Sequence, residues 1–556
     1  MPEAGQAPQS QSAARKLRVV MAQLDFLVGD IPGNTDLILE ATQRAWAEHQ
    51  ADIVVFPELC LTGYPPEDLL LRPSLDLRVS EALEKLQSAA LPPAMVIGAP
   101  IRSGGLLYNA ALVIEAGQVR GCYFKRFPPN YQVFDEKRYF AEGSDTLVLD
   151  IKGLPVGITV CEDLWKDGPL EDAAAAGARL ILNLNASPYD IDKQARRKAL
   201  LERKSRENRV SIVYVNLVGG QDELVFDGGS SCVDASGQLK VLAPYWQAGL
   251  MPIQLLQTSA DTWEPQAGEI EPDVEPEESL YCALVTGLRD YVNKSGFKGV
   301  VLGLSGGIDS ALSLAIAVDA LGPQRVQAVM MPYHYTADIS KQDAAEQANL
   351  LGVHYDVMPI EPMVEAFMGT LAESFAGTER DTTEENLQSR CRGVLLMAIS
   401  NKKGLMVLTT GNKSEMAVGY ATLYGDMVGG YNAIKDVYKT WVYRLARWRN
   451  TQSPAIPERV IERPPSAELA PDQQDSDSLP GYDVLDAILV RYIEGDMSAE
   501  SIIAAGFEEE DVYKVVKLVD RCEYKRRQAP VGVRVTPRGF GRDRRYPIVN
   551  GWQPGD

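Results

Sequence analysis

A glycine-rich turn between an apolar strand and a helix constrains the fold of this chain more than any other feature. The stretch Gly303-Leu-Ser-Gly-Gly-Ile-Asp-Ser310 follows the apolar run at 299–302 and precedes the apolar helical pattern at 311–318. A strand, a glycine turn and a helix N-terminus together present free backbone N–H groups, and such groups bind phosphate. The two adjacent glycines let a phosphate approach the backbone, and the serines add hydroxyl donors. The pattern predicts an α/β domain with a phosphate site; the alternative is a turn that only joins strand to helix.

A carboxylate inside this turn limits the possible phosphate sites. No Lys-Ser/Thr pair closes the turn, so it is not a Walker A loop. Asp309 would repel a phosphate unless a cation bridged them, so Mg²⁺ is implied. The Ser-Gly-Gly-x-Asp-Ser motif resembles the ATP pyrophosphatase family, whose members bind ATP and activate a carbonyl or carboxylate by adenylation. The resemblance implies a Rossmann-like domain with a parallel sheet.

The chain divides into two α/β segments. From about 17 to 260, short runs rich in Val, Ile and Leu alternate with polar helical stretches, which predicts a sheet covered by helices. Residues 261–278 are acidic, contain prolines and show no apolar periodicity, so we interpret them as a linker. A second α/β segment spans 279–556. Residues 1–16 are polar and small, and we expect them to form a disordered leader.

Charge and cysteine usage narrow the class of protein. The net charge of −21 argues against binding nucleic acid or an anionic membrane, and no run of about 18 apolar residues predicts a membrane span. One exception is the segment Arg521–Arg545, with nine Lys or Arg and two acids, which could hold an anionic small ligand or be a solvated basic tail. The seven scattered cysteines form no CxxC pair, which favours a reducing cytoplasm.

One cysteine is a candidate nucleophile. Cys161 ends the apolar run that starts at Pro155, just before a predicted turn, where a nucleophile would be exposed on a rigid edge. A buried structural cysteine is the alternative, and it is the commoner case. A catalytic cysteine needs a base and an anion stabiliser. The three histidines are poorly placed, since His49 lies on a predicted helix and His334 and His354 lie in the other segment. A carboxylate and a lysine would have to serve instead.

Two further strand ends supply those groups. Glu58 follows the apolar run at 53–56, and Lys125 follows a predicted hairpin. Each alone could be a solvated charge, but three strands that each end in a reactive group should converge at one rim of a sheet. The segments FPELCLTGYPPEDLL, KRFPPNYQVFDEKRYF and ITVCEDLW resemble the glutaminase branch of the nitrilase, or carbon-nitrogen hydrolase, family.

The nitrilase resemblance implies an α-β-β-α sandwich and a role for each residue. Glu58 would be the general base, Cys161 the nucleophile and Lys125 the oxyanion stabiliser, with the N–H of Glu162 as second donor. Glu136 would support the site. Three residues match positions that hold the glutamine substrate, namely Tyr131, Ser187 and Lys193.

Motifs in the second segment resemble the NAD synthetase family. They lie at 386–392, 408–415, 424–430, 435–439, 465–468 and 524–527. The resemblance implies that ATP is bound by Gly303, Leu304, Ser305, Gly306, Gly307, Ile308, Asp309, Ser310, Thr410, Lys439 and Ser466. It implies that deamido-NAD is contacted by Asn386, Glu415, Lys435 and Lys525, that Mg²⁺ is held by Asp309 and Glu415, and that the chain forms a homo-octamer.

The two resemblances together imply a glutamine-dependent ligase. The first segment would release ammonia from glutamine, and the second would use ATP to convert deamido-NAD to NAD, with AMP, pyrophosphate and glutamate as the other products. Because free ammonia is mostly protonated at neutral pH, we expect a protected tunnel between the sites. The alternatives are another amidotransferase, which would usually use a histidine or an N-terminal nucleophile, and a non-catalytic binding protein. Incubation with ATP and deamido-NAD would separate the three.

Overall fold

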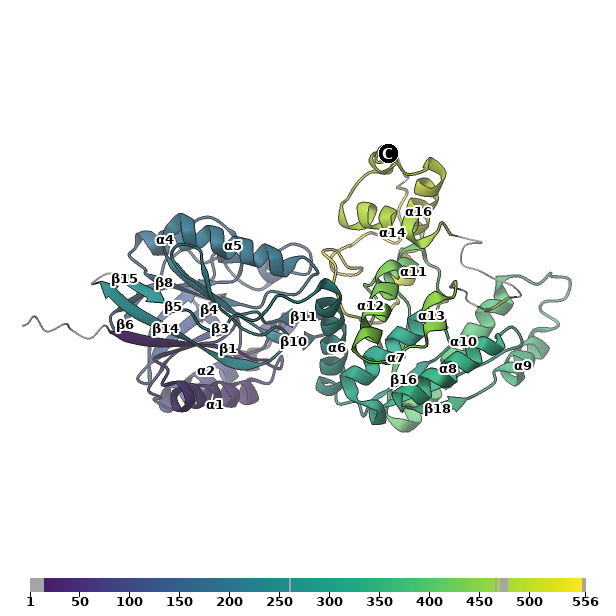
Figure 1. The fold of residues 1–556 in the computed structure, drawn as a ribbon, viewed down its shortest axis with the longest axis horizontal. Coiled ribbons are helices and arrows are strands. Elements are labelled where there is room, and N and C mark those ends of the chain that lie inside the picture. The colour runs from purple at the N-terminus through teal and green to yellow at the C-terminus, as the bar shows by residue number, and fades with distance from the viewer. Residues whose placement is uncertain (1–14, 260–261, 466–467, 471–478, 553–556) are drawn as a thin grey trace, which may run out of the picture.

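The computed structural model describes residues 15–259, 262–465, 468–470 and 479–552. It has two α/β halves, and helix α6 (Pro276–Lys294) stands between them in Figure 1. The small helical lobe that carries α14 and α16 rises from the second half.

The first half contains two sheets. The first sheet has seven strands, in the order β15 (Thr262–Pro265), β14 (Gly249–Ser259), β1 (Lys16–Gln23), β2 (Ile53–Val55), β3 (Ala94–Ser103), β4 (Leu106–Glu115) and β5 (Gln118–Phe124). The second has six, in the order β13 (Leu239–Leu242), β12 (Ser231–Val233), β9 (Ser211–Asn216), β8 (Leu180–Asn185), β7 (Leu154–Val160) and β6 (Val148–Ile151). A separate ribbon pairs β10 (Val218–Gln221) with β11 (Leu224–Asp227).

These two sheets pack face to face between helices. Val19 and Met21 of β1 share one apolar core with Val156 and Ile158 of β7. Helices α1 (Ile31–His49) and α2 (Pro73–Ser88) cover the outer face of the first sheet, and α4 (Pro169–Ala175) and α5 (Lys193–Asn208) cover that of the second. The central strands are nearly continuous apolar runs because both of their faces are buried. The predicted α-β-β-α sandwich is confirmed.

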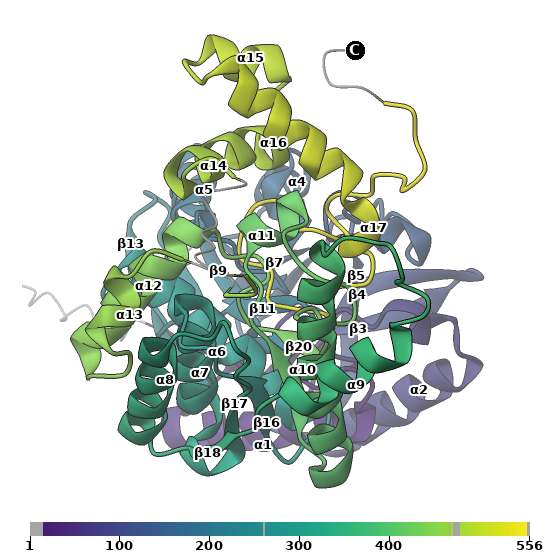
Figure 2. The same cartoon turned by 90° about the vertical axis from the view of Figure 1, so that its right-hand side faces the viewer.

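The second half is built on a parallel sheet of five strands. Their order is β18 (His354–Val357), β17 (Val326–Met330), β16 (Val300–Gly303), β19 (Met406–Thr409) and β20 (Tyr431–Asn432). One core joins this sheet to α6, α7 (Ile308–Leu321), α8 (Asp338–Leu351), α12 (Lys439–Gln452) and α13 (Glu458–Glu462). A second core joins the opposite face to α9 (Glu361–Leu371) and α10 (Thr382–Lys403), so helices cover both faces (Figure 2). The predicted Rossmann-like architecture is confirmed.

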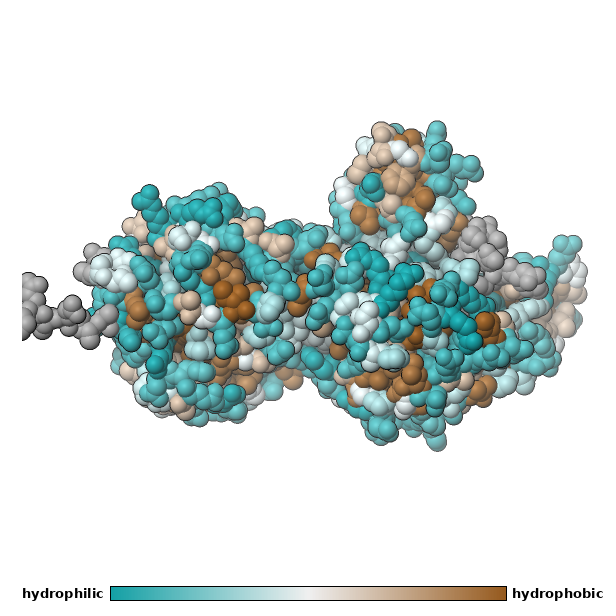
Figure 3. Space-filling model, in the orientation of Figure 1, coloured by the Kyte–Doolittle hydropathy of each residue, from teal (hydrophilic) through white to brown (hydrophobic). Residues whose placement is uncertain are grey.

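The small helical lobe completes the second half. Its helices are α11 (Lys413–Val418), α14 (Tyr482–Leu489), α15 (Ala499–Ala504), α16 (Glu509–Arg521) and α17 (Glu523–Arg526). The face of the molecule shown in Figure 3 is mostly hydrophilic, with hydrophobic residues scattered over it. Within the part of the chain that the structure describes, no helix combines the length and hydropathy that a bilayer crossing needs.

The predicted linker is shorter than its composition suggested. Residues 262–265 form β15 and pair with β14, because Trp263 fills a buried position between the two sheets. Helix α6 already begins at Pro276. The predicted leader, 1–16, lies almost wholly outside the described residues, and β1 begins at Lys16.

Candidate active sites

The first site lies between the two sheets of the first half. Glu58 follows β2 and Lys125 follows β5, both in the first sheet, whereas Cys161 follows β7 in the second. The expectation that all three groups share the rim of one sheet is therefore wrong. The sheets pack face to face, so their strand ends lie opposite each other and bring the groups together.

Lys125 connects two carboxylates inside the protein. Its Nζ lies 2.6 Å from Glu58 Oε1 and 2.9 Å from Glu136 Oε2. The Asn109 amide donates to both carboxylates, at 2.7 Å to Glu58 and 3.3 Å to Glu136. The other oxygen of Glu58 accepts a 3.0 Å bond from the Ala186 N–H. The side chains of Glu58 and Lys125 are fully buried, so this charge cluster is pre-organised rather than solvated.

Burial and mutual charge set the protonation of this cluster. Burial raises the pKa of Glu136 to about 7, although Lys125 opposes the shift. Burial would lower the pKa of Lys125, but the Glu136 and Glu58 carboxylates outweigh it and raise that pKa well above its usual range. Burial also raises the pKa of the Cys161 thiol, with Glu58 adding to the shift and Lys125 opposing it. A neutral thiol beside a carboxylate needs that carboxylate as its base.

The backbone presents Cys161 on a sharp elbow. Its φ of 45° and ψ of −101° lie in a region that residues with a side chain rarely adopt, and helix α3 (Glu162–Trp165) begins at the next residue. The first N–H groups of a helix have no partner within it, so the Glu162 N–H is available to stabilise an oxyanion. The Cys161 side chain belongs to the core between the sheets, yet the charges of Glu58 and Lys125 act on it. The thiol is therefore buried, yet it lies within electrostatic reach of both charged groups.

Asp163 connects the segment after β5, which contains Lys125, with the end of β7, which precedes Cys161. The sequence did not indicate this residue. Its Oδ1 accepts the N–H groups of Arg126 (3.0 Å) and Phe127 (2.9 Å), which directly follow Lys125. Its Oδ2 accepts the Val160 N–H (3.1 Å), directly before Cys161, and the Tyr123 hydroxyl (2.8 Å). Burial raises its pKa to about 6. The acidic pair Glu162-Asp163 after the apolar strand was the only available signal.

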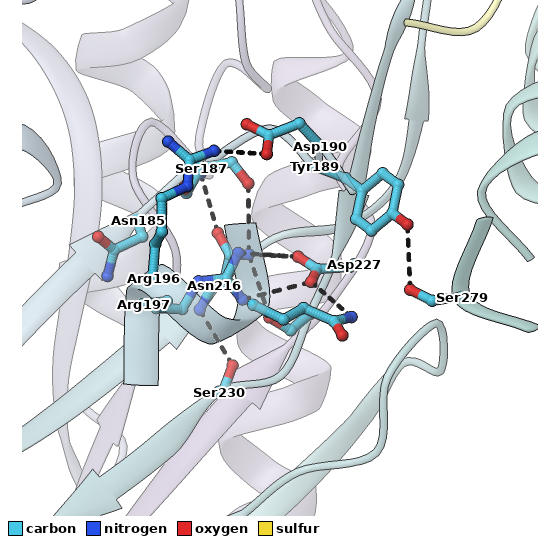
Figure 4. Close-up of polar contacts among 12 residues, drawn as sticks. Asn185, Ser187, Tyr189, Asp190, Arg196, Arg197, Asn216, Asp227, Ser230 and Ser279 are labelled. Atoms are coloured by element: carbon cyan, nitrogen blue, oxygen red, sulfur yellow. Dashed lines mark hydrogen bonds and ion pairs between the residues drawn. The ribbon is translucent and has the colours of Figure 1, made fainter. Parts of the chain in front are cut away.

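Two of the three predicted glutamine contacts, Tyr131 and Lys193, lie within electrostatic reach of Cys161. The Tyr131 hydroxyl donates a 2.8 Å bond to Glu162 Oε2, and Lys193 Nζ lies 4.8 Å from the centre of the Trp165 ring. Burial raises the pKa of Tyr131, and the charge of Cys161 adds to that shift. Burial lowers the pKa of Lys193, and the charge of Cys161 opposes that shift. Ser187 is held by its N–H, which donates to Asn216 Oδ1 at 2.9 Å (Figure 4).

The second site is the turn between β16 and α7. Ser310 Oγ accepts the Ser305 N–H at 3.2 Å, and Ser305 Oγ accepts the Gly307 N–H at 3.2 Å, so the serines hold the turn open. Gly306 has a φ of 83°, and a Cβ there would lie 2.3 Å from the Ser340 carbonyl oxygen. Only glycine fits this position. The predicted strand–turn–helix arrangement is confirmed.

The carboxylates of Asp309 and Glu415 converge on one ammonium group. Lys439 forms an ion pair with Asp309 Oδ2, and its Nζ lies 3.3 Å from Glu415 Oε1. Asn412 donates to the other oxygen of Asp309 at 2.8 Å and caps α11. Burial would lower the pKa of Lys439, but Asp309 and Glu415 raise it above its usual range. Two carboxylates that meet at one cationic position are a donor set that suits Mg²⁺.

The other predicted ligand residues lie around this turn and the lobe. Asn386 Oδ1 accepts the Thr422 hydroxyl at 2.9 Å, and Lys435 Nζ donates to the Pro530 carbonyl at 2.5 Å. Lys525 Nζ donates to the Gly419 carbonyl at 2.7 Å. Thr410 follows β19 directly and is partly buried. Ser466 lies outside the described residues.

Lys413 is a second residue that the sequence did not indicate. Its Nζ is fully buried, 2.8 Å from Asp436 Oδ1 and 2.9 Å from Glu494 Oε1. It also donates to Thr536 Oγ1 at 2.6 Å. It therefore anchors the C-terminal segment beneath the 435–439 stretch.

The C-terminal part of the basic segment Arg521–Arg545 is not a solvated tail. Its arginines pair with acidic side chains, at 2.8 Å for Arg534 with Asp543, 3.3 Å for Arg544 with Asp520, and 3.1 Å for Arg542 with Glu223. Arg542 also pairs with Glu67 of the first half. We call residues 530–545 the strap, because they contact both halves.

Comparison with known proteins identifies two family domains. The carbon-nitrogen hydrolase model matches residues 18–264, and the NAD synthase model matches residues 280–529. The chain is 49% identical to a glutamine-dependent NAD(+) synthetase of Acinetobacter baylyi, covering 98% of this chain and 100% of the relative. It is 50% identical to one of Xanthomonas campestris pv. campestris, covering 98% and 99%. A structure of the Acinetobacter baumannii glutamine-dependent NAD+ synthetase in complex with ADP superposes with a TM-score of 0.79, at 48% identity, covering 98% and 100%.

Proposed function

The chain belongs to the glutamine-dependent NAD(+) synthetase family, and from this premise we propose which of its residues carry each half of the reaction. The enzyme is a ligase that hydrolyses glutamine and uses ATP to amidate deamido-NAD, giving NAD, AMP, pyrophosphate and glutamate. Membership of this family decides against the other amidotransferases and against a non-catalytic binding protein.

Glutamine hydrolysis proceeds through Cys161. Glu58 takes the thiol proton, the sulfur attacks the carboxamide carbon, and the Lys125 ammonium and the Glu162 N–H stabilise the resulting oxyanion. The protonated Glu58 then gives its proton to the leaving nitrogen, so that ammonia departs and a thioester remains. Glu58 next takes a proton from water, and the oxygen attacks the thioester carbon. The C–S bond then breaks, glutamate is released, and Glu58 returns its proton to the Cys161 sulfur. Tyr131, Ser187 and Lys193 hold the substrate, and Glu136 fixes the Lys125 ammonium.

Amidation takes place above the Gly303–Ser310 turn. The turn, Thr410, Lys439 and Ser466 bind ATP, while Asn386, Glu415, Lys435 and Lys525 contact deamido-NAD. The deamido-NAD carboxylate attacks the α-phosphorus and displaces pyrophosphate, and ammonia then attacks the acyl carbon and displaces AMP. Asp309 and Glu415 would hold Mg²⁺, which balances the charge of the phosphates when bound. The convergence of both carboxylates on Lys439 supports this pair as the metal ligands.

Several broader features belong to the same proposal. Ammonia passes from Cys161 to the adenylate through a protected channel, which prevents its loss as ammonium. The enzyme works in the cytoplasm, in keeping with its seven free cysteines. The glutaminase domain comprises residues 17–265, the connection 266–275 and the synthetase domain 276–556, and the chain assembles as a homo-octamer.

The observation that carries the proposal is the buried contact of Lys125 with Glu58 and Glu136, within the electrostatic reach of Cys161. The test supplies [amide-¹⁵N]glutamine, ATP, Mg²⁺ and deamido-NAD to the purified chain. We expect ¹⁵N in the NAD amide and one AMP for each NAD formed. Glutamate release without labelled NAD would disprove the transfer step, and NAD formation with ammonium but not with glutamine would disprove the glutaminase assignment.

A further inference from the structure

The strap joins two segments that each carry residues assigned above to substrate. The first segment, 186–191, follows β8 and holds Ser187, and its Ala186 N–H bonds to Glu58 Oε2. The second, 435–439, holds Lys435 and Lys439. The segments lie in different halves of the molecule, so a direct link between them would connect the glutamine site with the nucleotide site.

One residue of the strap is bonded to both segments. The Val535 carbonyl accepts the Ile191 N–H at 3.0 Å, and the Val535 N–H donates to Asp436 Oδ2 at 2.9 Å. Asp436 also accepts the Thr536 hydroxyl at 2.7 Å. A shift of the 435–439 segment therefore pulls on Val535, the same residue that holds Ile191.

A second contact reaches closer to the glutamine site. Arg534 Nη1 donates to the Tyr189 carbonyl at 3.4 Å, two residues after Ser187. The Arg534 N–H donates to the Glu223 carbonyl at 2.8 Å, and its Nε pairs with Asp543 at 2.8 Å. Arg534 is nearly buried, so these bonds are shielded from water.

The 186–191 segment has little freedom to move independently of the second half. The Tyr189 ring packs in the core of the synthetase half, and its hydroxyl bonds to Ser279 of α6 at 3.1 Å (Figure 4). On the other side, Asp190 pairs with Arg196 at 2.5 Å. The segment is thus fixed at Ala186 to the catalytic carboxylate and at Tyr189–Ile191 to the strap and α6.

From this geometry we propose that the strap positions the glutamine-holding segment, and that Arg534 is a positioning residue for glutamine hydrolysis. Arg534 acts through the Tyr189 carbonyl and does not touch the reacting atoms. Binding of ATP and deamido-NAD orders the 435–439 segment. The contacts of Asp436, Val535 and Ile191 transmit this ordering to Glu58. This inference rests on the proposed function, because it assumes that Cys161 hydrolyses glutamine.

The test compares Arg534→Ala with Arg538→Ala in the full-length chain. Arg538 lies on the same strap, but its side chain pairs with Asp496 and donates to the Ile493 carbonyl, both in the second half. Each variant is assayed for glutamine hydrolysis with and without ATP and deamido-NAD, and for NAD synthesis from ammonium.

We expect Arg534→Ala to lower kcat/KM for glutamine about tenfold and to abolish any increase caused by ATP and deamido-NAD, as fits the loss of a charged hydrogen bond. NAD synthesis from ammonium should stay within about twofold of the unmodified enzyme, and Arg534→Lys should restore part of the glutamine activity. The Arg538→Ala control should keep both activities.

Two results would overturn the inference: glutamine kinetics of Arg534→Ala that match those of Arg538→Ala, or a loss of ammonium-dependent synthesis in parallel with glutamine hydrolysis. If Arg534→Ala does not fold, Arg542→Ala offers a milder change, since Arg542 is partly exposed and pairs with Glu67 and Glu223. Normal coupling in that variant would likewise count against the strap. An unmodified enzyme without glutaminase activity would instead refute the proposed function.

Discussion

Replacing Cys161 by Ala should separate the two half-reactions, and the structure supplies a matched control. Cys232 in β12 is also free and buried, and it lies in the same core between the sheets as Cys161. Unlike Cys161, it has neither Glu58 nor Lys125 among the groups that shift its pKa. Cys161→Ala and Cys232→Ala therefore remove the same atom from the same core, but only one removes the nucleophile.

The expected magnitudes differ between stability and activity. Each variant loses one buried sulfur, about the size of a methylene, which should lower the free energy of unfolding by about 1 kcal/mol. For a domain of this size that corresponds to a Tm lower by about 2–4 °C. Cys161→Ala should reduce glutamine-dependent NAD synthesis on the order of 10⁶-fold, effectively to zero, because loss of a nucleophile disables the whole catalytic unit. Ammonium-dependent synthesis should stay within about twofold in both variants.

The assay measures NAD formation with either glutamine or ammonium chloride as the nitrogen source, alongside a thermal melt. If Cys161→Ala lost ammonium-dependent synthesis while its Tm matched that of Cys232→Ala, the two activities would share one site and our reasoning would be wrong. Glutamine-dependent activity that persisted in Cys161→Ala would refute the nucleophile assignment directly.

Three further predictions concern the charged groups of the two sites. The Glu136 carboxyl, whose pKa burial raises to about 7, gains a proton as the pH falls, so kcat/KM for glutamine should drop on the acid side of pH 7; Glu136→Gln should remove that limb of the pH profile, and an unchanged midpoint would contradict the assignment. Asp163→Asn should lower glutamine turnover about 10- to 100-fold, because the NH2 group of the new amide would face backbone N–H groups that need an acceptor. Ammonium-dependent synthesis should be unaffected, and a loss of both activities would indicate misfolding instead. Asp309→Asn should reduce synthesis from glutamine and from ammonium alike by about 10²-fold or more, measured as AMP release, and rescue by ammonium would disprove its role at the nucleotide.

The sequence revealed the reactive groups because each follows an apolar strand. Glu58, Lys125 and Cys161 were found in this way, and so was the turn at 303–310. Which strands pair and which sheets face each other depends on contacts between distant residues, so the meeting of two sheets at Cys161 could not be read from local pattern. The same limit explains β15, since a four-residue strand within an acidic stretch leaves no periodic signal.

Buried charges were the harder class to predict. Asp163 and Lys413 look like solvated charges in the sequence, and only their partners show otherwise. Asp163 accepts backbone N–H groups from the segment after β5 and from the end of β7, and Lys413 is surrounded by Asp436, Glu494 and the strap. Charged residues are almost never fully buried unless paired, so their burial is visible only once the partners are known. The basic segment was ambiguous for the same reason.

The strap also sets an order of events during translation. Arg534 and Tyr189 are 345 positions apart in the chain. At 5–20 residues per second, a ribosome needs roughly 20–70 s to travel from one to the other. During that interval the first half of the nascent chain has no strap, so the segment that holds glutamine is not yet positioned for hydrolysis. The first catalytic centre is therefore complete only after the strap has been synthesised.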